Sequence, residues 1–467
     1  MYEIIGIKNV TENILNFNYD KYYRKMGLML KNTKTESERR QIKQSSNEEL
    51  NSLLKDVDID IEALKNNFIK IILDEKSAKY LWILYSKHQN GENYIDMLSS
   101  ILKQENKVIR GGTNTYKMNG WMAHTLYVYQ IVNDNIANNI EIINFNGNKE
   151  NIKQVQELHE IYNKLSKESK FLLKIFALIH DIGVIDGVTF HDKTGGKYVE
   201  KVLNEIGINQ EAIKQANITF ELKDFIKILQ EMIKYHTLIT SLSSEGSDLY
   251  VENEYKKLLK ELPKNSYIEK EIPSILLILA YGDIIAVDES LMDSEKYRRI
   301  KNCNKFFMQI NEGKMQRNKE EVVIERICDI IGENKVQNLK SKFDIILQKY
   351  NIEKEQFVED MYNIKIMRYA GPLMKTLKDT EMTIKIFYEL FELIKDIEGK
   401  DELKNYTIIF APDKHENDFV EQFKNGNFFE CIKQMKNTKA KEFIYKNINI
   451  KLGTDSEGKY LHIRVVA

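Results

Sequence analysis

Apolar residues recur along much of the chain at the spacing of an α-helix. In the segments "FLLKIFALIHDIG", "FIKILQEMIKYHT" and "EMTIKIFYELFELIKDI" they return every three or four positions. This spacing places them on one face of a helix, where they can pack against a core. Only 4 prolines and 21 glycines interrupt the 467 residues, so long helices are expected. The pattern predicts a mainly α protein.

The pattern changes near the two ends of the chain. A short β-like run covers Tyr2 to Ile7. Near the C-terminus, "NYTIIFAP" and "NINIKLGTDSEGKYLHIRVVA" alternate apolar and polar residues around a Ser-Glu-Gly turn. Alternation of this kind is typical of strands joined by a hairpin. We therefore expect a small α/β or β-hairpin unit at the C-terminal end.

The length of the chain exceeds what one hydrophobic core usually supports, so two or three structural units are expected. Two polar stretches, Asn135 to Gln156 and Thr240 to Glu254, are weakly periodic and predict loops or insertions. We expect four regions along the chain: a mostly helical one at 1–105, a central one at 106–303 that contains five of the eight histidines, a helical one at 304–400 and the α/β unit at 401–467.

Charge and cysteine content exclude some classes of function. The 69 Lys and Arg residues balance 70 Asp and Glu residues, so the chain has no global basic field that would attract nucleic acid or membranes, although a local basic patch is compatible with this balance. Cys303, Cys328 and Cys431 lie far apart without CxxC spacing. Neither a disulfide framework nor a zinc ribbon is expected, which fits a reducing cytoplasm.

The N-terminal sequence and the longest apolar run bear on localisation. The first residues lack a basic segment followed by an apolar one, and "IPSILLILAYGDIIAV" contains Asp283 and is too short to cross a bilayer. We expect a soluble, cytoplasmic protein with no membrane association.

Ionisable residues occupy the apolar stripe of four predicted helices. His124 stands in "WMAHTLYVYQIV", His180 ends "FLLKIFALIH" before a possible helix C-cap at Gly183, His236 follows "FIKILQEMIKY", and Asp283 interrupts the apolar run above. A single such histidine is more often a hydrogen-bonded core residue than a ligand. Several in one interior would carry a desolvation penalty that only pairing or a bound cation offsets.

Imidazole and carboxylate groups without thiolates form the ligand set of a hard to borderline metal such as Mn, Fe, Zn, Ni or Mg. The other histidines stand in different contexts. His88 and His415 lie among polar residues, His159 lies on a predicted charged helix, and His462 lies in a predicted strand. We expect these four to be structural or surface residues.

The order of these residues resembles a known family. His124, His180-Asp181 and Asp283 resemble the H…HD…D signature of the HD-domain metal-dependent phosphohydrolase superfamily, and "HDIG" is the form of its commonest subset. "YKMNGWMAHTLYV" is similar to the stretch around the first histidine in HD proteins related to 3′-to-5′ exoribonucleases and conjugative relaxases, with Asn119-Gly120 in place of Gly-Gly. His191, Gly195-Gly196 and "IKYHT" resemble the continuation of the HDIG subset. The resemblance covers about residues 108 to 300.

The resemblance implies an HD-domain helical bundle with a metal centre. His124, His180, Asp181 and Asp283 would hold one divalent ion, and Asp181 would bridge to a second ion if His191 and His236 bind it. Two such ions would activate water and hold a phosphoryl group. A site with one ion stays open, in which His191 would protonate a leaving oxygen. Asp181, His191 and Lys193 are the expected catalytic residues.

Two positions depart from the family pattern. Val184 stands where many HDIG enzymes have Lys, and Tyr127 stands where Arg is frequent. A substrate phosphate would then need other cations. Lys193, Lys197 and the pair Arg298-Arg299 are candidates, although a charge on a solvated face is the commoner explanation for each.

Three functions follow from this interpretation. The first is hydrolysis of a phosphoester in a nucleotide or at the 3′ end of a single-stranded nucleic acid. The second is oxygen-dependent cleavage at a di-iron centre, which some HD proteins with the same ligand order perform. The third is an HD module used mainly for ligand binding and protein interaction. The sequence does not indicate the oligomeric state.

Overall fold

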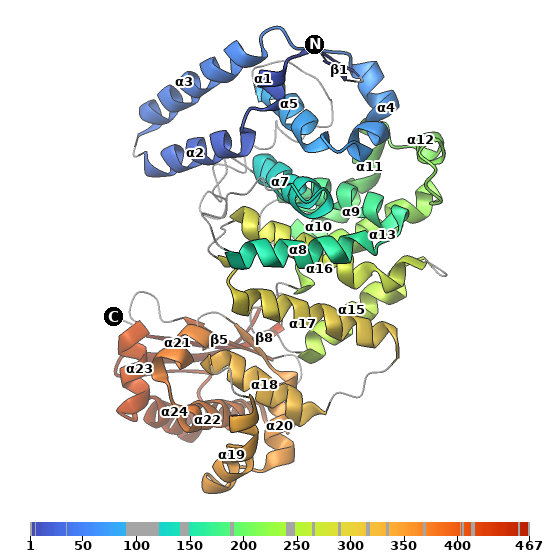
Figure 1. The fold of residues 1–467 in the computed structure, drawn as a ribbon. Coiled ribbons are helices and arrows are strands. Elements are labelled where there is room, and N and C mark those ends of the chain that lie inside the picture. Colours follow the sequence, from blue (N-terminus) through green and yellow to red (C-terminus); the bar gives the residue numbers. More distant parts are fainter. Residues whose placement is uncertain are drawn as a thin grey trace. The chain divides into compact units, whose positions relative to one another are not determined.

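The chain folds into two compact units, which are described separately below (Figure 1). Unit 1 comprises Met1–Ile239 and Lys257–Asn311, and unit 2 comprises Thr240–Lys256 and Glu312–Ala467. The computed structural model describes residues 2–4, 6–33, 35–89, 121–140, 149–186, 191–239, 248–263, 267–287, 291–313, 318–332, 336–367, 370–401, 403, 406–411, 416–455 and 458–465. The predicted class, mainly α with a small C-terminal sheet, is confirmed.

The N-terminal part of unit 1 is helical with a small antiparallel sheet. Its strands lie in the order β1-β2-β3. Thr35 caps α3 by accepting a hydrogen bond from the Glu38 amide, and the Glu38 carboxylate accepts one from the Thr35 amide, so two amides at the helix start are satisfied. The elements are β1 (Tyr2–Ile4), β2 (Ile7–Val10), α1 (Glu12–Leu15), α2 (Tyr19–Asn32), α3 (Glu36–Leu54), β3 (Asp58–Ile59), α4 (Ile61–Leu73) and α5 (Ser77–Gln89).

The rest of unit 1 is a bundle of helices around α16. This helix is buried along nearly its whole length and contacts α7, α8, α9 and α17, which explains why its sequence is apolar on all sides. The elements are α7 (Trp121–Gln130), η1 (Ile131–Ala137), α8 (Lys149–Asn163), α9 (Lys167–Ile179), η2 (Ile182–Asp186), α10 (His191–Gly195), η3 (Gly196–Tyr198), α11 (Val199–Glu205), α12 (Gln210–Gln215), α13 (Leu222–Lys234), η4 (Tyr267–Lys270), α16 (Ile272–Val287) and α17 (Ser294–Asn311). Helix α15 (Asp248–Glu261) has residues in both units.

Both stretches predicted as loops contain helix. Residues Ile131–Ala137 extend α7 as a π-helix, and α8 begins at Lys149. The extension is stabilised by buried polar residues: the Asn133 side-chain amide donates to the Glu75 carbonyl at 2.8 Å. In α8, Val155, Leu158 and Tyr162 supply a buried face that the high asparagine content obscured. In the second stretch, α15 begins at Asp248. Residues 141–148 and 240–247 lie outside the described residues.

Unit 2 combines helices with a five-stranded mixed sheet in the order β4-β5-β8-β7-β6. The β4-β5 and β5-β8 pairs are parallel, and β7 pairs antiparallel with both β8 and β6. The predicted C-terminal hairpin is confirmed by the β7-β8 register, in which Asp455 pairs with Gly458. The elements are α18 (Lys319–Ile331), α19 (Val336–Lys349), α20 (Lys354–Asn363), β4 (Lys365–Met367), α21 (Ala370–Leu377), α22 (Thr380–Glu398), β5 (Tyr406–Ala411), α23 (Glu416–Lys424), α24 (Asn427–Thr438), β6 (Glu442–Tyr445), β7 (Ile448–Asp455) and β8 (Gly458–Val465).

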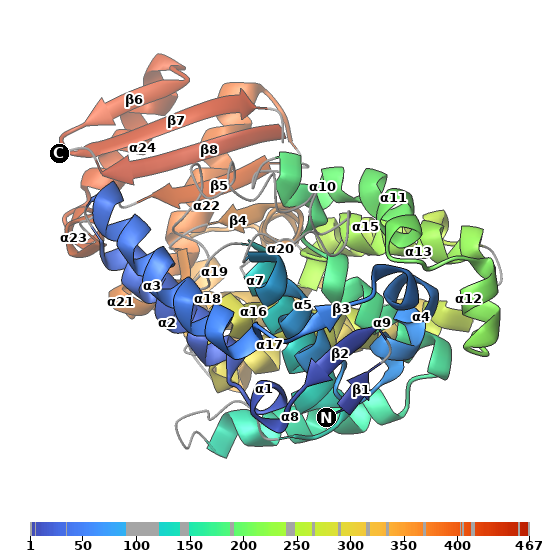
Figure 2. The same cartoon turned by 90° about the horizontal axis from the view of Figure 1, so that it is seen from above.

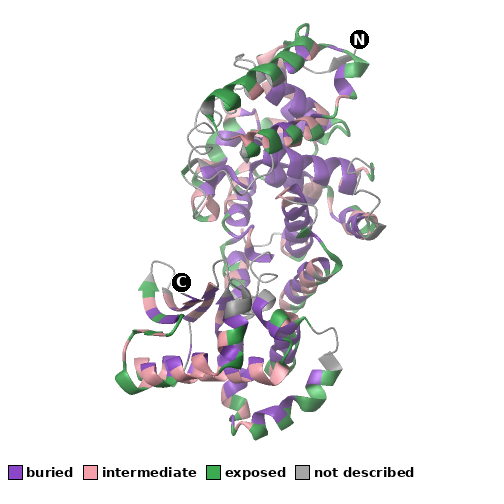
Figure 3. Cartoon of the chain, turned by 90° about the vertical axis from the view of Figure 1, so that its left-hand side faces the viewer, coloured by how far each residue is buried: buried purple, intermediate pink, exposed green. Residues whose placement is uncertain are grey.

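Burial follows the expected periodicity within each unit. Figure 3 shows that buried residues gather along the inner sides of the helices and strands, while exposed residues lie on the outer sides. In β5, for example, buried and partly exposed residues alternate, as a sheet packed on one face requires. Among the described helices, none combines the length and apolar composition needed to cross a bilayer.

Candidate metal centre

The six predicted ligands converge in unit 1 from five segments of the chain. The positions follow from the helices that carry them: His124 lies on α7, His180 is the C-terminal cap residue of α9 with Asp181 next to it, His191 begins α10, His236 lies two residues beyond α13, and Asp283 lies on α16. The two helices that lead to the centre of the cluster are well anchored. In α9 every residue from Phe171 to Ile179 is buried, and in α13 the apolar stripe from Phe225 to Ile233 is buried.

Two groups of three ligands share one carboxylate. The ligand atoms of His124, His180 and Asp181 lie within 4.8 Å of one another, and so do those of Asp181, His191 and His236. Each group could therefore hold a metal ion. Asp181 belongs to both groups, and it is only 4% exposed.

The two carboxylate oxygens of Asp181 divide between neighbouring imidazoles. Oδ2 lies 3.7 Å from His124 Nε2, and Oδ1 lies 3.7 Å from His180 Nε2. Oδ1 also lies 3.2 Å from His191 Nε2 and 3.5 Å from His236 Nε2. A carboxylate that faces imidazoles with both oxygens can ligate two cations at once.

Asp283 completes the group around His124. Its Oδ1 lies 3.0 Å from His124 Nε2 and 3.8 Å from His180 Nε2. The first group therefore offers two imidazoles and two carboxylates, a common ligand set for divalent transition metals.

Backbone carbonyls orient two of the imidazoles. His180 Nδ1 donates to the Ala177 carbonyl at 3.0 Å, and His236 Nδ1 donates to the Ile233 carbonyl at 2.7 Å. Because a carbonyl only accepts, Nδ1 must carry the hydrogen, and the neutral ring presents the Nε2 lone pair to the cluster. His180 Nε2 is buried and has no hydrogen-bond partner among the described residues. A buried acceptor left in this state fits a bound cation.

Neighbouring charges determine the ionisation of the cluster. Burial acts to lower the pKa of His180, but the carboxylates of Asp181 and Asp283 outweigh burial and raise this pKa. Burial acts to raise the pKa of Asp181, yet His180, His191 and His236 hold it well below its usual value. The pKa of Asp283 is lowered in the same way, against the effect of burial, by His124 and His180. Both carboxylates are therefore ionised at neutral pH and available as ligands.

Gly183 allows α10 to lie against the turn that follows His180-Asp181. A Cβ atom on Gly183 would stand 1.8 Å from the His191 carbonyl oxygen and 2.7 Å from the Gly195 amide nitrogen. The expected role of Gly183 as a helix C-cap is wrong, because α9 ends at Ile179 and Gly183 lies in η2. The residue is instead needed for this close approach, which places His191 in the cluster.

Solvent reaches the cluster at Asp283 and His191, which we call its exposed edge. The side chains of Asp283 and His191 are 26% and 19% exposed, whereas those of His124, His180 and His236 are at most 2% exposed. A substrate would therefore meet the cluster beside His191 and Asp283.

The predicted cations differ in their surroundings. Lys193 is exposed on α10, two residues after His191. Lys197 forms an ion pair with Asp186 at 2.6 Å, so its charge is already matched. Arg298 is exposed and Arg299 partly exposed on α17.

One arginine contact near the cluster was not predicted. Tyr127, three residues after His124, accepts a hydrogen bond from Arg24 Nη1 at 3.1 Å, and the Arg24 guanidinium carbon lies 5.3 Å from the centre of the Tyr127 ring. Arg24 lies on α2, 103 residues earlier in the chain, so no local sequence pattern predicts this contact.

The histidines expected to be structural lie apart from the cluster where the structure describes them. His159 lies on α8, where Nδ1 donates to the Ile136 carbonyl at 2.7 Å, and His462 lies on β8 in unit 2. The side chain of His88, all of His415 and the Asn119-Gly120 pair fall outside the described residues.

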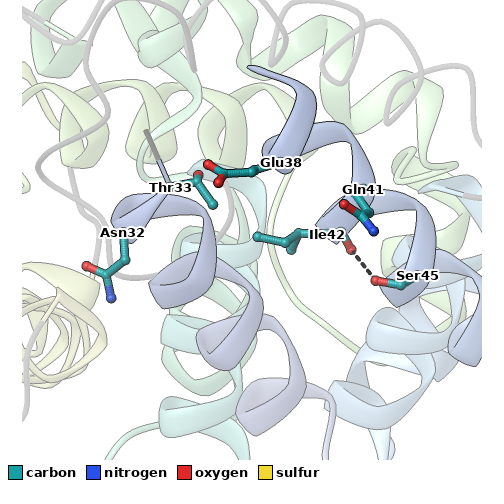
Figure 4. Close-up of a pocket in the computed structure, with 6 residues that line it drawn as sticks. All are labelled: Asn32, Thr33, Glu38, Gln41, Ile42 and Ser45. Atoms are coloured by element: carbon teal, nitrogen blue, oxygen red, sulfur yellow. Dashed lines mark hydrogen bonds between the residues drawn. The ribbon is translucent and has the colours of Figure 1, made fainter. Parts of the chain in front are cut away.

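A separate pocket lies between α2 and α3 (Figure 4). Ser45 Oγ donates to the Ile42 carbonyl at 3.1 Å at its edge. Its single carboxylate, Glu38, caps α3, and its lining contains no imidazole, so it offers no ligand set like that of the cluster. The lining residues are Asn32, Thr33, Glu38, Gln41, Ile42 and Ser45.

Comparison with known proteins assigns no family. The chain matches no protein-family model, and no curated protein matches its sequence.

Proposed function

We propose that the chain is a metal-dependent phosphohydrolase that acts on a phosphoester of a nucleotide or a nucleic acid, with two divalent cations in the cluster. One observation carries the proposal: Asp181 is shared between two adjacent groups of ligands. A carboxylate placed between two cation sites is the arrangement expected for a pair of ions that act on one phosphoryl group.

Each ligand would have a defined part in this centre. His124, His180, Asp181 and Asp283 would hold the first ion, and Asp181, His191 and His236 would hold the second. Bound divalent ions supply Lewis-acid activation of water and neutralise the charge of a phosphoryl group. The protein contributes the orientation of the ligands, through the Nδ1 hydrogen bonds of His180 and His236, and burial that excludes bulk water from all but one edge.

A second role is proposed for His191, whose side chain is partly exposed. If the cluster holds a single ion, His191 Nε2 would donate a proton to a leaving oxygen, a role suited to the ordinary pKa range of imidazole. Counting the ions per chain distinguishes the two arrangements.

The test of the proposal combines metal content with hydrolysis. The purified protein should contain a divalent metal and, with added Mn or Mg, should release product from a panel of nucleoside phosphates, cyclic dinucleotides and short single-stranded RNA and DNA. Asp181→Ala should lose both metal and turnover, because it removes the shared ligand. His159→Gln is the matched control, since it changes a histidine of the same unit outside the cluster. Full metal content and turnover in Asp181→Ala would refute the proposal.

The donor set also favours a second candidate, a di-iron oxygenase. Four imidazoles surround the shared carboxylate, and iron accepts such a histidine-rich set as readily as manganese or zinc. In that case the purified protein should contain iron and consume dioxygen, and it should leave every phosphoester of the panel intact.

A further inference from the structure

The sheet of unit 2 has two faces of different character. On one face Tyr406, Ile408 and Phe410 of β5 are buried, and the Phe410 ring lies 6.1 Å from Phe387 of α22 and 6.3 Å from Phe419 of α23. The register of the strands places the other residues on the opposite face, which we call the outer face. It comprises Lys365, Met367, Thr407, Ile409, Ala411, Glu442, Ile444, Asn449, Lys451, Gly453, Asp455, Gly458, Tyr460, His462 and Arg464.

Helices α22 and α24 lie on the same side of this sheet in both views (Figures 1 and 2). In the view of Figure 2 the strands are seen from the side away from these two helices. At the β6 edge of the outer face, Ile444 is 56% exposed. This part of the face is therefore open to a partner.

We propose that the outer face binds single-stranded nucleic acid. The proposal goes beyond the phosphohydrolase function and does not depend on it, because every residue that carries it lies in unit 2. Three features support the proposal: an aromatic ring that extends over the neighbouring strand, a small excess of cationic positions, and an arginine with an unused donor.

The aromatic ring belongs to Tyr460 of β8. Its cross-strand partner in β7 is Gly453, and a Cβ atom on Gly453 would stand 2.5 Å from the Tyr460 Cζ and hydroxyl oxygen. The end of the Tyr460 ring therefore lies over the glycine. A nucleobase can stack on a side of this ring that β7 does not cover.

Cations outnumber carboxylates on the outer face. Lys365, Lys451 and Arg464 are cationic positions of the outer face, and Glu442 and Asp455 are its two acidic positions. Lys451 and Glu442 form an ion pair at 3.1 Å, so the net charge of the face remains positive. The chain as a whole has a net charge of -1, and a local cationic surface of this kind favours a polyanion.

Arg464 has a hydrogen-bond donor that the fold does not use. Its Nε is buried and has no hydrogen-bond partner among the described residues. Guanidinium groups bind phosphate oxygens through such N–H groups. An orphaned donor on a cationic face is therefore consistent with a phosphate ligand.

The spacing of these side chains suits an extended single strand of nucleic acid. Tyr460, His462 and Arg464 point to the same face of β8 at intervals of two residues, which is roughly 7 Å in a β-strand, a distance that one extended nucleotide can span. The neighbouring positions on β5, Thr407 and Ala411, are small, so they leave room above the sheet. A peptide partner would instead pair as an added strand with the edge strand β6, and it would not need the row formed by Tyr460, His462 and Arg464.

The test measures binding by the full chain in the presence of EDTA, so that no hydrolysis interferes. The probes are fluorescein-labelled oligothymidylate and oligouridylate of about 12 nucleotides. Binding is measured by fluorescence anisotropy at about 50 and about 200 mM salt. We expect wild-type protein to bind both probes and to lose affinity as salt rises. Asp181→Ala should bind equally well, which separates this proposal from the phosphohydrolase function.

Variants of the outer face should weaken binding selectively. Tyr460→Leu should raise the Kd about tenfold, because a base loses its stacking partner. Arg464→Gln should raise the Kd and reduce the salt dependence by about one phosphate contact. Because this variant keeps a polar side chain on the sheet, it tests the proposal even if Tyr460→Leu does not fold.

Lys451→Gln and Lys340→Gln form a matched pair. Both remove an exposed lysine of unit 2 that is paired with a glutamate, but Lys340 lies on α19 and contacts Glu321 at 2.7 Å. Only Lys451→Gln should weaken binding. The proposal is overturned if wild-type protein binds neither probe, or if correctly folded Arg464→Gln and Lys451→Gln bind as wild type does.

Discussion

His191 Nε2 lies 3.2 Å from His236 Nε2, although the two residues are 45 positions apart in the chain. Both atoms also approach Asp181 Oδ1, at 3.2 and 3.5 Å. His236 Nδ1 already donates to the Ile233 carbonyl, so a neutral His236 directs its Nε2 lone pair at His191. Two imidazole nitrogens are stable at this distance only if a proton or a cation lies between them.

This relationship predicts the effect of removing His236. His236→Ala should reduce the metal content from about two ions per chain to about one, because the first group keeps all its ligands. His462→Ala, which changes a histidine of unit 2, should leave the metal content unchanged. The measurement is elemental analysis of protein dialysed against buffer with trace metal. A full complement of two ions in His236→Ala would contradict the assignment of the second site.

Gly183→Ala should destabilise the protein and weaken the second site. The added methyl group would overlap the His191 carbonyl oxygen at 1.8 Å, so α10 must move, and overpacking of this kind typically costs about 1–3 kcal/mol. Gly282→Ala is the matched control, because its Cβ would meet its nearest neighbour, Val128 Cγ1, at an ordinary 3.5 Å. Thermal unfolding of both variants checks the difference. Equal melting temperatures for wild type and Gly183→Ala would show that the close approach does not constrain α10.

The pH dependence of the metal-free protein should have a definite sign. The carboxylates of Asp181 and Asp283 outweigh burial and raise the pKa of His180 in the folded state. Its stabilising contribution is therefore complete below the unfolded pKa of about 6.5 and is lost as the pH rises through the folded pKa. The pKa values of Asp181 and Asp283 are lowered in the folded state. The stabilising contribution of these two carboxylates is therefore lost in the acid range, as the pH falls through their folded pKa values.

The measurement is the melting temperature of EDTA-treated protein at pH values from slightly acid to alkaline. The melting temperature of the wild type should fall as the pH rises, and that of His180→Gln should fall less. With metal present the trend should reverse, because ligation requires neutral imidazoles. A His180→Gln variant with the same pH profile as wild type would exclude His180 as the titrating group.

Lys193 and Lys197 should differ in their importance for turnover. Lys197 is held by Asp186, so Lys197→Gln should change KM less than about twofold. Lys193 lies two residues from His191 at the exposed edge, and Lys193→Gln should raise KM about tenfold if it contacts a substrate phosphate. Steady-state kinetics on the best phosphoester of the panel decides the point. Equal effects of both variants would indicate a general charge effect rather than a specific contact.

Much of the cluster could be predicted from the sequence, because an ionisable residue within an apolar stripe has few explanations. His124 and Asp283 follow the helical periodicity of α7 and α16, and His180 follows that of α9. His236 was harder to place, since α13 ends at Lys234 and the side chain reaches the cluster from a turn. The contact between Arg24 and Tyr127 depends on the tertiary fold and has no local pattern.

The fold was predictable where the interactions are local. The β7-β8 hairpin follows from alternation around a turn, but the parallel pairing of β4 with β5 joins segments about forty residues apart and depends on helices α21 and α22 between them. The π-helix could not be predicted, because Asn133 and Asn135 normally indicate loops and are stabilised here by partly buried hydrogen bonds to the carbonyls of Glu75 and Ile140.

The position of Asp181 between two groups of imidazoles implies that two ions bound there would be thermodynamically linked. The first ion would repel a second cation, and it would also orient the shared carboxylate for that cation. Whichever effect is larger, each ion would change the affinity for the other by the same factor. At limiting metal, a population of chains would contain mixed occupancies rather than one uniform species, so activity would depend on metal concentration more steeply or more gradually than for independent sites.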